Sequence, residues 1–88
     1  MKVKLDKEKV YTQVLNKYCE IASQGLRVEK EKTFADKLFL FTERNIEECF
    51  LRDKLEKLAL FRDMLFSSDQ EFIELSEEEY VLIYGVSL

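Results

Sequence analysis

Histidine, proline and tryptophan are absent from the sequence, and glycine occurs only at Gly25 and Gly85. Without histidine, the chain has neither a His-based catalytic triad nor a histidine general base. Because glycine is scarce and proline is missing, the chain has few tight turns, which argues against a many-stranded sandwich or barrel. The absences therefore favour a helical protein without histidine chemistry.

Several motifs that carry chemistry are also missing. There is no glycine-rich phosphate loop and no G-x-S-x-G turn, and the acidic residues do not follow the order of a calcium-binding loop. Carboxylates are numerous, but a short helical chain with little glycine offers poor material for a catalytic cleft. We therefore expect no enzymatic activity, no cofactor and no metal site.

Long apolar runs are absent as well. No window approaches eighteen consecutive apolar residues, so we expect no transmembrane helix. The first residues, Met-Lys-Val-Lys-Leu-Asp, lack the apolar segment of a secretory signal. Membrane-surface helices are rich in Lys and Arg, whereas this chain has a formal net charge of −4. These features predict a cytoplasmic protein that does not bind membranes.

The two cysteines, Cys19 and Cys49, each fall on an apolar helical arc. We expect both to be reduced thiols in the core, as is usual for a cytoplasmic protein. A disulfide between them is the alternative.

The most apolar and most clearly helical stretch is residues 45–66. Its leucines recur at helical spacing and share one side of the helix: Leu51, Leu55, Leu58 and Leu65. Asn45 is a candidate N-terminal cap. With 88 residues the chain is one domain, residues 1–88. We predict an all-α fold, a small bundle of about four helices packed around residues 45–66.

Capping signals place the other helices. Asp6 starts the first helix and Gly25 ends it. Thr33 starts a second helix that turns Phe34, Ala35, Leu38 and Phe41 inward. The charged stretch between these helices is predicted to be a connector or a first exposed turn. The second helix either breaks near residues 42–45, as we favour, or continues into the next one as a single rod.

The last predicted helix begins at Ser76, which forms a capping box with Glu79, and ends at Gly85. A hairpin that pairs residues 72–75 with residues 80–86 is the alternative, because both runs contain good strand formers.

Charge is unevenly distributed along the chain. Residues 1–44 carry a net charge of +3 and residues 45–88 carry −7. Beyond Phe66 there are six acidic residues and no basic residue. Such asymmetry marks either a binding surface or a solvated face that pairs with the lysine-rich start. The candidate partner-binding residues are Asp69, Glu71, Glu74, Glu77, Glu78, Glu79 and Tyr80.

Recognition of another protein is the function class that these exclusions leave. We expect a small non-enzymatic regulator or adaptor of the inhibitor or anti-activator type, such as phages and bacteria encode. Its acidic helical surface would bind a partner with a basic surface. One alternative is a small transcriptional regulator that contacts DNA through the lysine-rich N-terminal half. The other is an acidic mimic of nucleic acid. Direct nucleic-acid binding is not favoured, because phosphate contacts need concentrated Lys and Arg.

A homodimer is also expected, because a chain this short buries a thin core. The predicted dimer interface is the apolar part of the second helix and the residues after it: Phe34, Leu38, Leu40 and Phe41.

Overall fold

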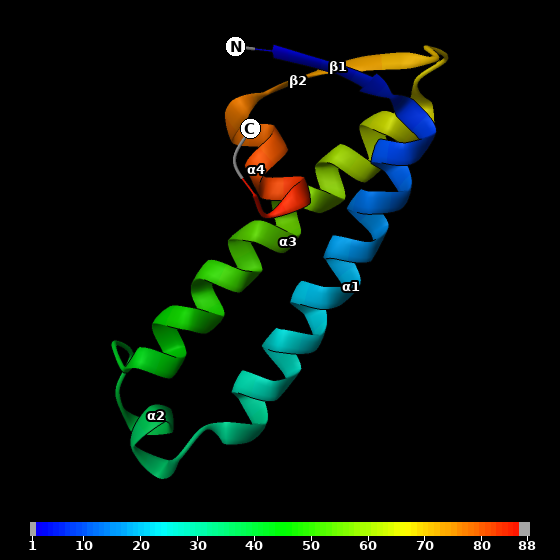
Figure 1. The fold of residues 1–88 in the computed structure, drawn as a ribbon. Helices are drawn as coiled ribbons and strands as arrows, with labels where there is room; N and C mark the ends of the chain where they lie inside the picture. The colour runs from blue at the N-terminus through cyan, green and yellow to red at the C-terminus, as the bar shows by residue number, and fades with distance from the viewer. Residues whose placement is uncertain (1, 87–88) are drawn as a thin grey trace.

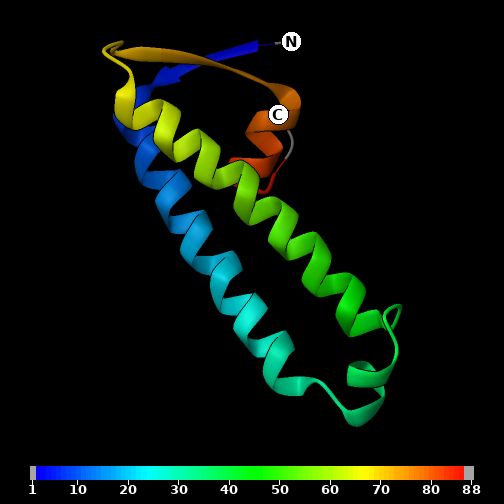
Figure 2. The same cartoon turned by 180° about the vertical axis from the view of Figure 1, so that it is seen from behind.

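Two long antiparallel helices form the shaft of the molecule (Figure 1, Figure 2). The computed structural model describes residues 2–86, which form, in chain order, β1 (Lys2–Asp6), α1 (Lys7–Glu31), α2 (Phe34–Leu38), α3 (Glu43–Ser67), β2 (Phe72–Ser76) and α4 (Glu77–Tyr84). The radius of gyration is 15.5 Å, whereas a compact chain of this length has about 12 Å. The molecule is therefore elongated. The strands and α4 form a head at one end, and α2 lies at the other end.

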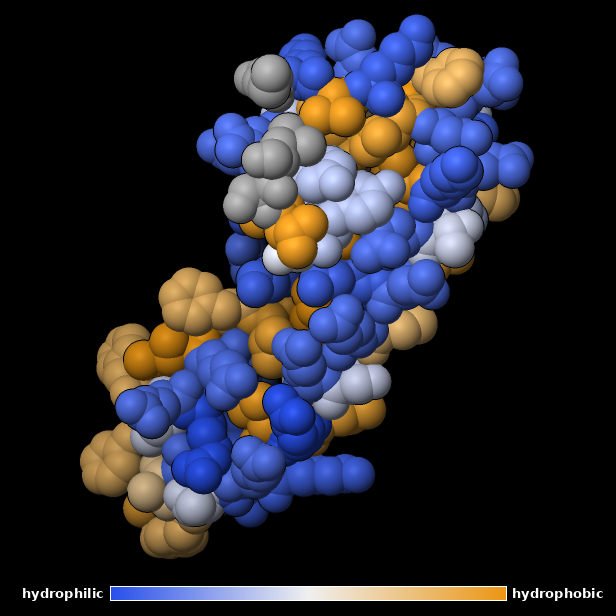
Figure 3. Space-filling model, viewed as in Figure 1, coloured by the Kyte–Doolittle hydropathy of each residue, from blue (hydrophilic) through white to orange (hydrophobic). Residues whose placement is uncertain are grey.

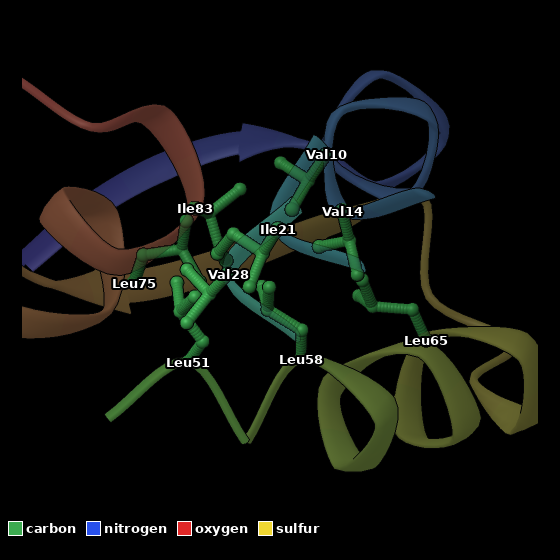
Figure 4. Packing of buried hydrophobic residues seen from close by; sticks show 9 residues of the cluster. All are labelled: Val10, Val14, Ile21, Val28, Leu51, Leu58, Leu65, Leu75 and Ile83. Carbon is green, nitrogen blue, oxygen red and sulfur yellow. The ribbon is translucent and has the colours of Figure 1, made fainter. Parts of the chain in front are cut away.

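The shaft is held together by a heptad pattern on each helix. In α1 the buried Val14, Ile21 and Val28 are seven residues apart, and in α3 the same spacing relates Leu51, Leu58 and Leu65. Residues with this spacing face one partner helix along its whole length. Figure 4 shows these side chains pointing toward one another between the helices. Burial of this seam defines the core.

The head is closed by a two-stranded antiparallel sheet. Lys2 lies opposite Ser76 and Asp6 lies opposite Phe72. The pairing continues into the shaft, because the backbone N–H of Lys7 donates to the Glu71 carbonyl oxygen at 3.0 Å. Inward-facing Leu75 is buried with the core, so the sheet covers one end of the shaft.

Local signals fix the ends of α4 as predicted. Ser76 and Glu79 form the capping box, and Gly85 ends the helix with a left-handed φ of 76°. Gln13 Nε2 donates to the Ile83 carbonyl oxygen at 3.3 Å. Ile83 is fully buried, so α4 packs against α1 and joins the head to the shaft.

The predicted helical character is confirmed, but the all-α prediction missed the sheet. Residues 72–76 form a strand that pairs with residues 2–6, so the alternative hairpin with residues 80–86 is wrong. The structure does not confirm a bundle around residues 45–66. Among the elements of residues 2–86, only α1 accompanies α3 along its length, while α4 lies beside the shaft at the end that carries the sheet (Figure 1).

The predicted stop at Gly25 is wrong, because α1 continues through it to Glu31. Three residues later, Val28 is the last seam residue of α1 and is 3% exposed. An internal glycine costs a helix only about 1 kcal/mol, whereas burying a valine stabilises by about 1.5–3 kcal/mol. The predicted connector is therefore helical as far as Glu31.

A break between the second and third helices is confirmed, but it lies at residues 39–42 rather than at the predicted 42–45, since α2 ends at Leu38 and α3 begins at Glu43. The prediction that both cysteines lie in the core is wrong: Cys19 and Cys49 are free and exposed. Each lies two residues before a seam residue, Ile21 or Leu51, which places it about 200° around its helix. Their thiols therefore face away from the seam.

Candidate interaction surfaces

At the end of the shaft farthest from the head, a charged side chain is buried and the large apolar side chains are exposed. We call residues 34–41 the tip. Its only buried side chain is the charged Asp36, which is 7% exposed. Its large apolar side chains all face solvent, with exposed fractions of 76%, 62%, 65%, 82% and 87% for Phe34, Leu38, Phe39, Leu40 and Phe41. The tip thus reverses the usual distribution of apolar and charged groups.

The Asp36 carboxylate is held by several donors. The Thr33 backbone N–H donates to Oδ2 at 2.7 Å, the Thr33 hydroxyl lies 3.1 Å from the same atom, and the Arg44 guanidinium is 3.5 Å away. The Thr33 N–H bond, followed by the Thr42 hydroxyl bond, holds the pKa of Asp36 below its ordinary value. The carboxylate is therefore ionised and anchors the start of α2.

Asn45 ties the tip to α3. Its Nδ2 donates to the carbonyl oxygens of Asp36 and Phe39, each at 2.7 Å. Its backbone N–H donates to the Thr42 hydroxyl at 3.3 Å, which makes Thr42 the N-cap of α3. The prediction that Asn45 is the cap is therefore wrong by one turn, because an earlier capping residue is present.

These contacts give the tip a defined shape although its apolar groups are unburied. At roughly 200 Å² for a large side chain, the five together expose about 700 Å². The largest apolar patch on a typical monomer is about 300–600 Å². Figure 3 shows apolar surface gathered over this end of the molecule. Exposed apolar patches of this size are typical of interaction surfaces on soluble proteins.

The apolar surface extends from the tip onto α3. Ile46 and Phe50, on the first turns of α3, are 42% and 66% exposed. Together with Gln24 of α1 they line a shallow depression between the two helices. The tip therefore adjoins a further apolar strip.

The predicted dimer-interface residues, Phe34, Leu38, Leu40 and Phe41, all lie in the tip and are exposed. The prediction that Phe34, Ala35, Leu38 and Phe41 turn inward is wrong, because all four are exposed. The α1–α3 seam is already filled by aliphatic side chains. The tip is held in place by the hydrogen bonds of Asp36 and Asn45 rather than by burial of its apolar side chains. The homodimer itself stays a prediction.

The acidic candidates are divided among three elements. Asp69 and Glu71 lie in the loop after α3, Glu74 is in β2, and Glu77, Glu78, Glu79 and Tyr80 begin α4. Glu79 is committed to its capping box, in which its carboxylate accepts the Ser76 N–H at 3.0 Å. Tyr80 stacks on Tyr84 with ring centroids 4.6 Å apart. These residues share the head, but they do not form one helical face.

The lysine-rich start lies beside this acidic segment. Lys4 is directly opposite Glu74 in the sheet, and its ammonium is 5.3 Å from the centre of the Phe72 ring. Within the described residues, no salt bridge involves an acid of residues 69–79. The nearby Lys4 ammonium therefore offsets part of the negative charge of Glu74 without forming an ion pair with it.

Residues 2–86 contain no group of three His, Cys, Asp or Glu side chains that could hold a metal ion. Over the same residues, no helix has the length and apolar character to cross a membrane. No family model matches this sequence, and no curated protein or solved structure is similar to it.

Proposed function

We propose that this chain is a small non-enzymatic regulator or adaptor that binds another protein, and that the tip is its recognition surface. The observation that carries the proposal is the inverted tip, in which Asp36 is buried and the five large apolar side chains are exposed. Exposing them costs free energy in water. The capped and hydrogen-bonded turn keeps them in place, so less ordering is needed when a partner binds.

The chemistry of the tip indicates the kind of surface that it fits. Three of its five apolar side chains are phenylalanines, and aromatic residues are common anchors at interface centres. Lys37 and the ion-paired Asp36 are the only charged residues within it. The partner is therefore expected to offer an apolar groove, and binding should be resistant to salt.

The acidic segment supports a second, electrostatic contribution. Glu77 and Glu78 are exposed at the start of α4, and no salt bridge in the described residues neutralises them. Exposed charge of one sign speeds encounter with a surface of opposite sign. We propose that the head steers a basic partner, as the sequence suggested, while the tip supplies the anchor.

We do not propose that the lysine-rich start binds DNA. Lys7 of the lysine-rich start donates its Nζ to the Ser68 carbonyl oxygen at 2.7 Å. The Lys7 ammonium thus binds the head rather than projecting toward a ligand, and the chain as a whole has a net charge of −4, which opposes phosphate binding.

Affinity capture with matched variants tests the role of the tip. The bait is the purified full chain, and the lysate comes from the organism that encodes it. Phe41→Ser removes a phenylalanine that is 87% exposed in the tip, and Phe66→Ser removes one that is 79% exposed at the other end of α3. We expect a specific protein on the wild-type and Phe66→Ser columns in 0.5 M salt, and its loss on the Phe41→Ser column. Equal capture by all three chains would contradict the proposal.

A further inference from the structure

A second heptad pattern lies on α3, outside the interface with α1. It consists of six residues at alternating spacings of four and three: Ile46, Phe50, Asp53, Lys57, Leu60 and Met64. We call this row the outer seam. Its apolar members are exposed by 42%, 66%, 71% and 54% in that order, and the side chains of Asp53 and Lys57 by 58% and 59%. Residues at this spacing lie along one face of a helix and can face a partner helix, as the a and d positions of a coiled coil do.

The outer seam is symmetric about a point level with Leu55. Ile46 and Met64 are each nine residues from that point, and Phe50 and Leu60 are each five residues from it. Asp53 and Lys57 are each two residues from it and carry opposite charges. In such a row, apolar residues lie at equal distances on both sides of the centre and the two central charges are opposite. The row is therefore complementary to an antiparallel copy of itself.

We propose that the outer seam binds the outer seam of a second copy of this chain, antiparallel, around a two-fold axis level with Leu55. Ile46 of each copy then faces Met64 of the other, and Phe50 faces Leu60. At the centre, Asp53 of each copy faces Lys57 of the other, which forms two ion pairs across the axis. The contact is isologous, as a two-fold dimer requires.

Charge selects this orientation over the parallel one. In a parallel dimer in register, Asp53 would face Asp53 and Lys57 would face Lys57, and like charges at facing positions repel. In the single chain, Lys57 Nζ lies 3.2 Å from Asp53 Oδ2. The antiparallel arrangement keeps this pair and adds its counterpart, so four charges alternate in sign.

The size of the outer seam suits a modest interface. Six side chains that each expose about half or more of roughly 200 Å² offer about 600 Å² per copy. The total of about 1,200 Å² is at the lower end for specific protein interfaces. A shallow depression lined by Lys57, Leu60, Phe61, Met64 and Glu79 lies where Phe50 of the second copy would pack.

The flanking positions near the axis limit the affinity. Lys54 and Glu56 lie on either side of the centre, and each would face its own counterpart. Both are exposed, so these like-charge contacts weaken the dimer without preventing it. We expect dissociation constants in the micromolar range. The inference is independent of the proposed function of the tip, because the residues of the tip are not part of the outer seam.

Charge exchange tests the proposal, with sedimentation velocity from 1 to 200 μM as the readout. Wild type should form a species of twice the 10.5 kDa monomer mass. Asp53→Lys and Lys57→Asp should each weaken the dimer at least tenfold, because each places like charges across the axis. An equimolar mixture of the two variants should form a heterodimer, and the double variant Asp53→Lys/Lys57→Asp should dimerise like wild type.

The matched control is Arg52→Glu. Arg52 forms an ion pair with Glu48 four residues away, at 3.0 Å, so its reversal also places like charges four residues apart on α3, but on a different face. This variant should dimerise normally, and circular dichroism should show all variants folded. A wild-type chain that is monomeric at 200 μM overturns the proposal. So does a dimer that resists both single reversals but is lost on Phe41→Ser, which would place the contact at the tip.

Discussion

The side-chain amide of Asn45 joins the first turn of α3 to the carbonyl oxygen of Asp36 in α2, at 2.7 Å. The same nitrogen also donates to the Phe39 carbonyl oxygen at 2.7 Å. One side chain therefore holds both the helix and the loop from which the exposed phenylalanines project.

Replacing Asn45 with alanine should loosen the tip while the head stays intact. The variant loses two hydrogen bonds, which contribute about 0.5–1.5 kcal/mol each. Backbone amides of residues 34–42 should exchange with deuterium faster, and those of α4 should be unchanged. Asn16→Ala, at an exposed position of α1, is the control. Equal protection in the two variants would mean that the turn holds its shape without Asn45.

The tip should also respond to acid. Because its folded pKa is lowered by the Thr33 N–H and Thr42 hydroxyl bonds, Asp36 stabilises the fold above its unfolded pKa, about 3.9. That contribution is lost as the pH falls through the lower folded pKa. The NMR amide signals of Thr33 and Asn45 should therefore shift in strong acid. In Asp36→Asn this transition should disappear, whereas Asp69→Asn, in the loop after α3, should retain it.

Leu58 and Leu60 form a natural pair for testing the core. Leu58 is fully buried in the seam and Leu60 is 71% exposed. Leu58→Ala should lower the free energy of unfolding by about 2–5 kcal/mol, and Leu60→Ala by about 0.5 kcal/mol or less. Urea denaturation at submicromolar protein, where association does not contribute, measures both. Similar losses for the two variants would be inconsistent with the seam as the core.

Gly25→Ala should stabilise the protein. Gly25 lies inside α1, and an added Cβ would meet no atom within 4 Å. Alanine restricts the unfolded chain and favours the helix, so we expect a gain of about 0.5–1 kcal/mol. Thermal denaturation checks this with wild type as reference. A lower melting temperature would show that the glycine has a role in the α1 backbone that its surroundings do not reveal.

The acidic segment can be tested by neutralising Glu71 and Glu74. Glutamine is preferable to lysine at residue 74, because a lysine there would lie directly opposite Lys4 in the sheet. The double glutamine variant should fold with a stability within about 0.5 kcal/mol of wild type. Its association with the protein captured through the tip should be slower at low salt. An unchanged association rate at low salt would make the segment a solvated face only.

The features that could be predicted from the sequence are those set by neighbouring residues. The caps at Asp6 and Ser76 and the stop at Gly85 each depend on residues within one turn. The helical spacing of Leu51, Leu55, Leu58 and Leu65 predicted the inward face of α3, on which Leu55 is only partly buried. These signals predicted where helices form and where several of them begin or end.

Contacts between distant residues were harder to predict. Val3 and Leu5 alternate with charged residues, and Glu74 separates Ile73 from Leu75. This period of two was a strand signal. However, nothing local shows that the two short runs pair. The direction of the tip side chains was also unpredictable, because burial depends on what else fills the core. Thr42 was a capping signal that could have been found, three residues before Asn45.

The pairing of β1 with β2 has a consequence for the order of folding. Asp6 and Phe72 are opposite each other although they are 66 positions apart in the sequence, so direct closure of that loop from the unfolded chain is entropically costly. Once the α1–α3 hairpin has formed, the start of α1 lies beside the end of α3, and the strands have little distance left to close. We therefore expect the sheet to form last and to open first. Local opening of the head would then leave the tip and most of the seam folded.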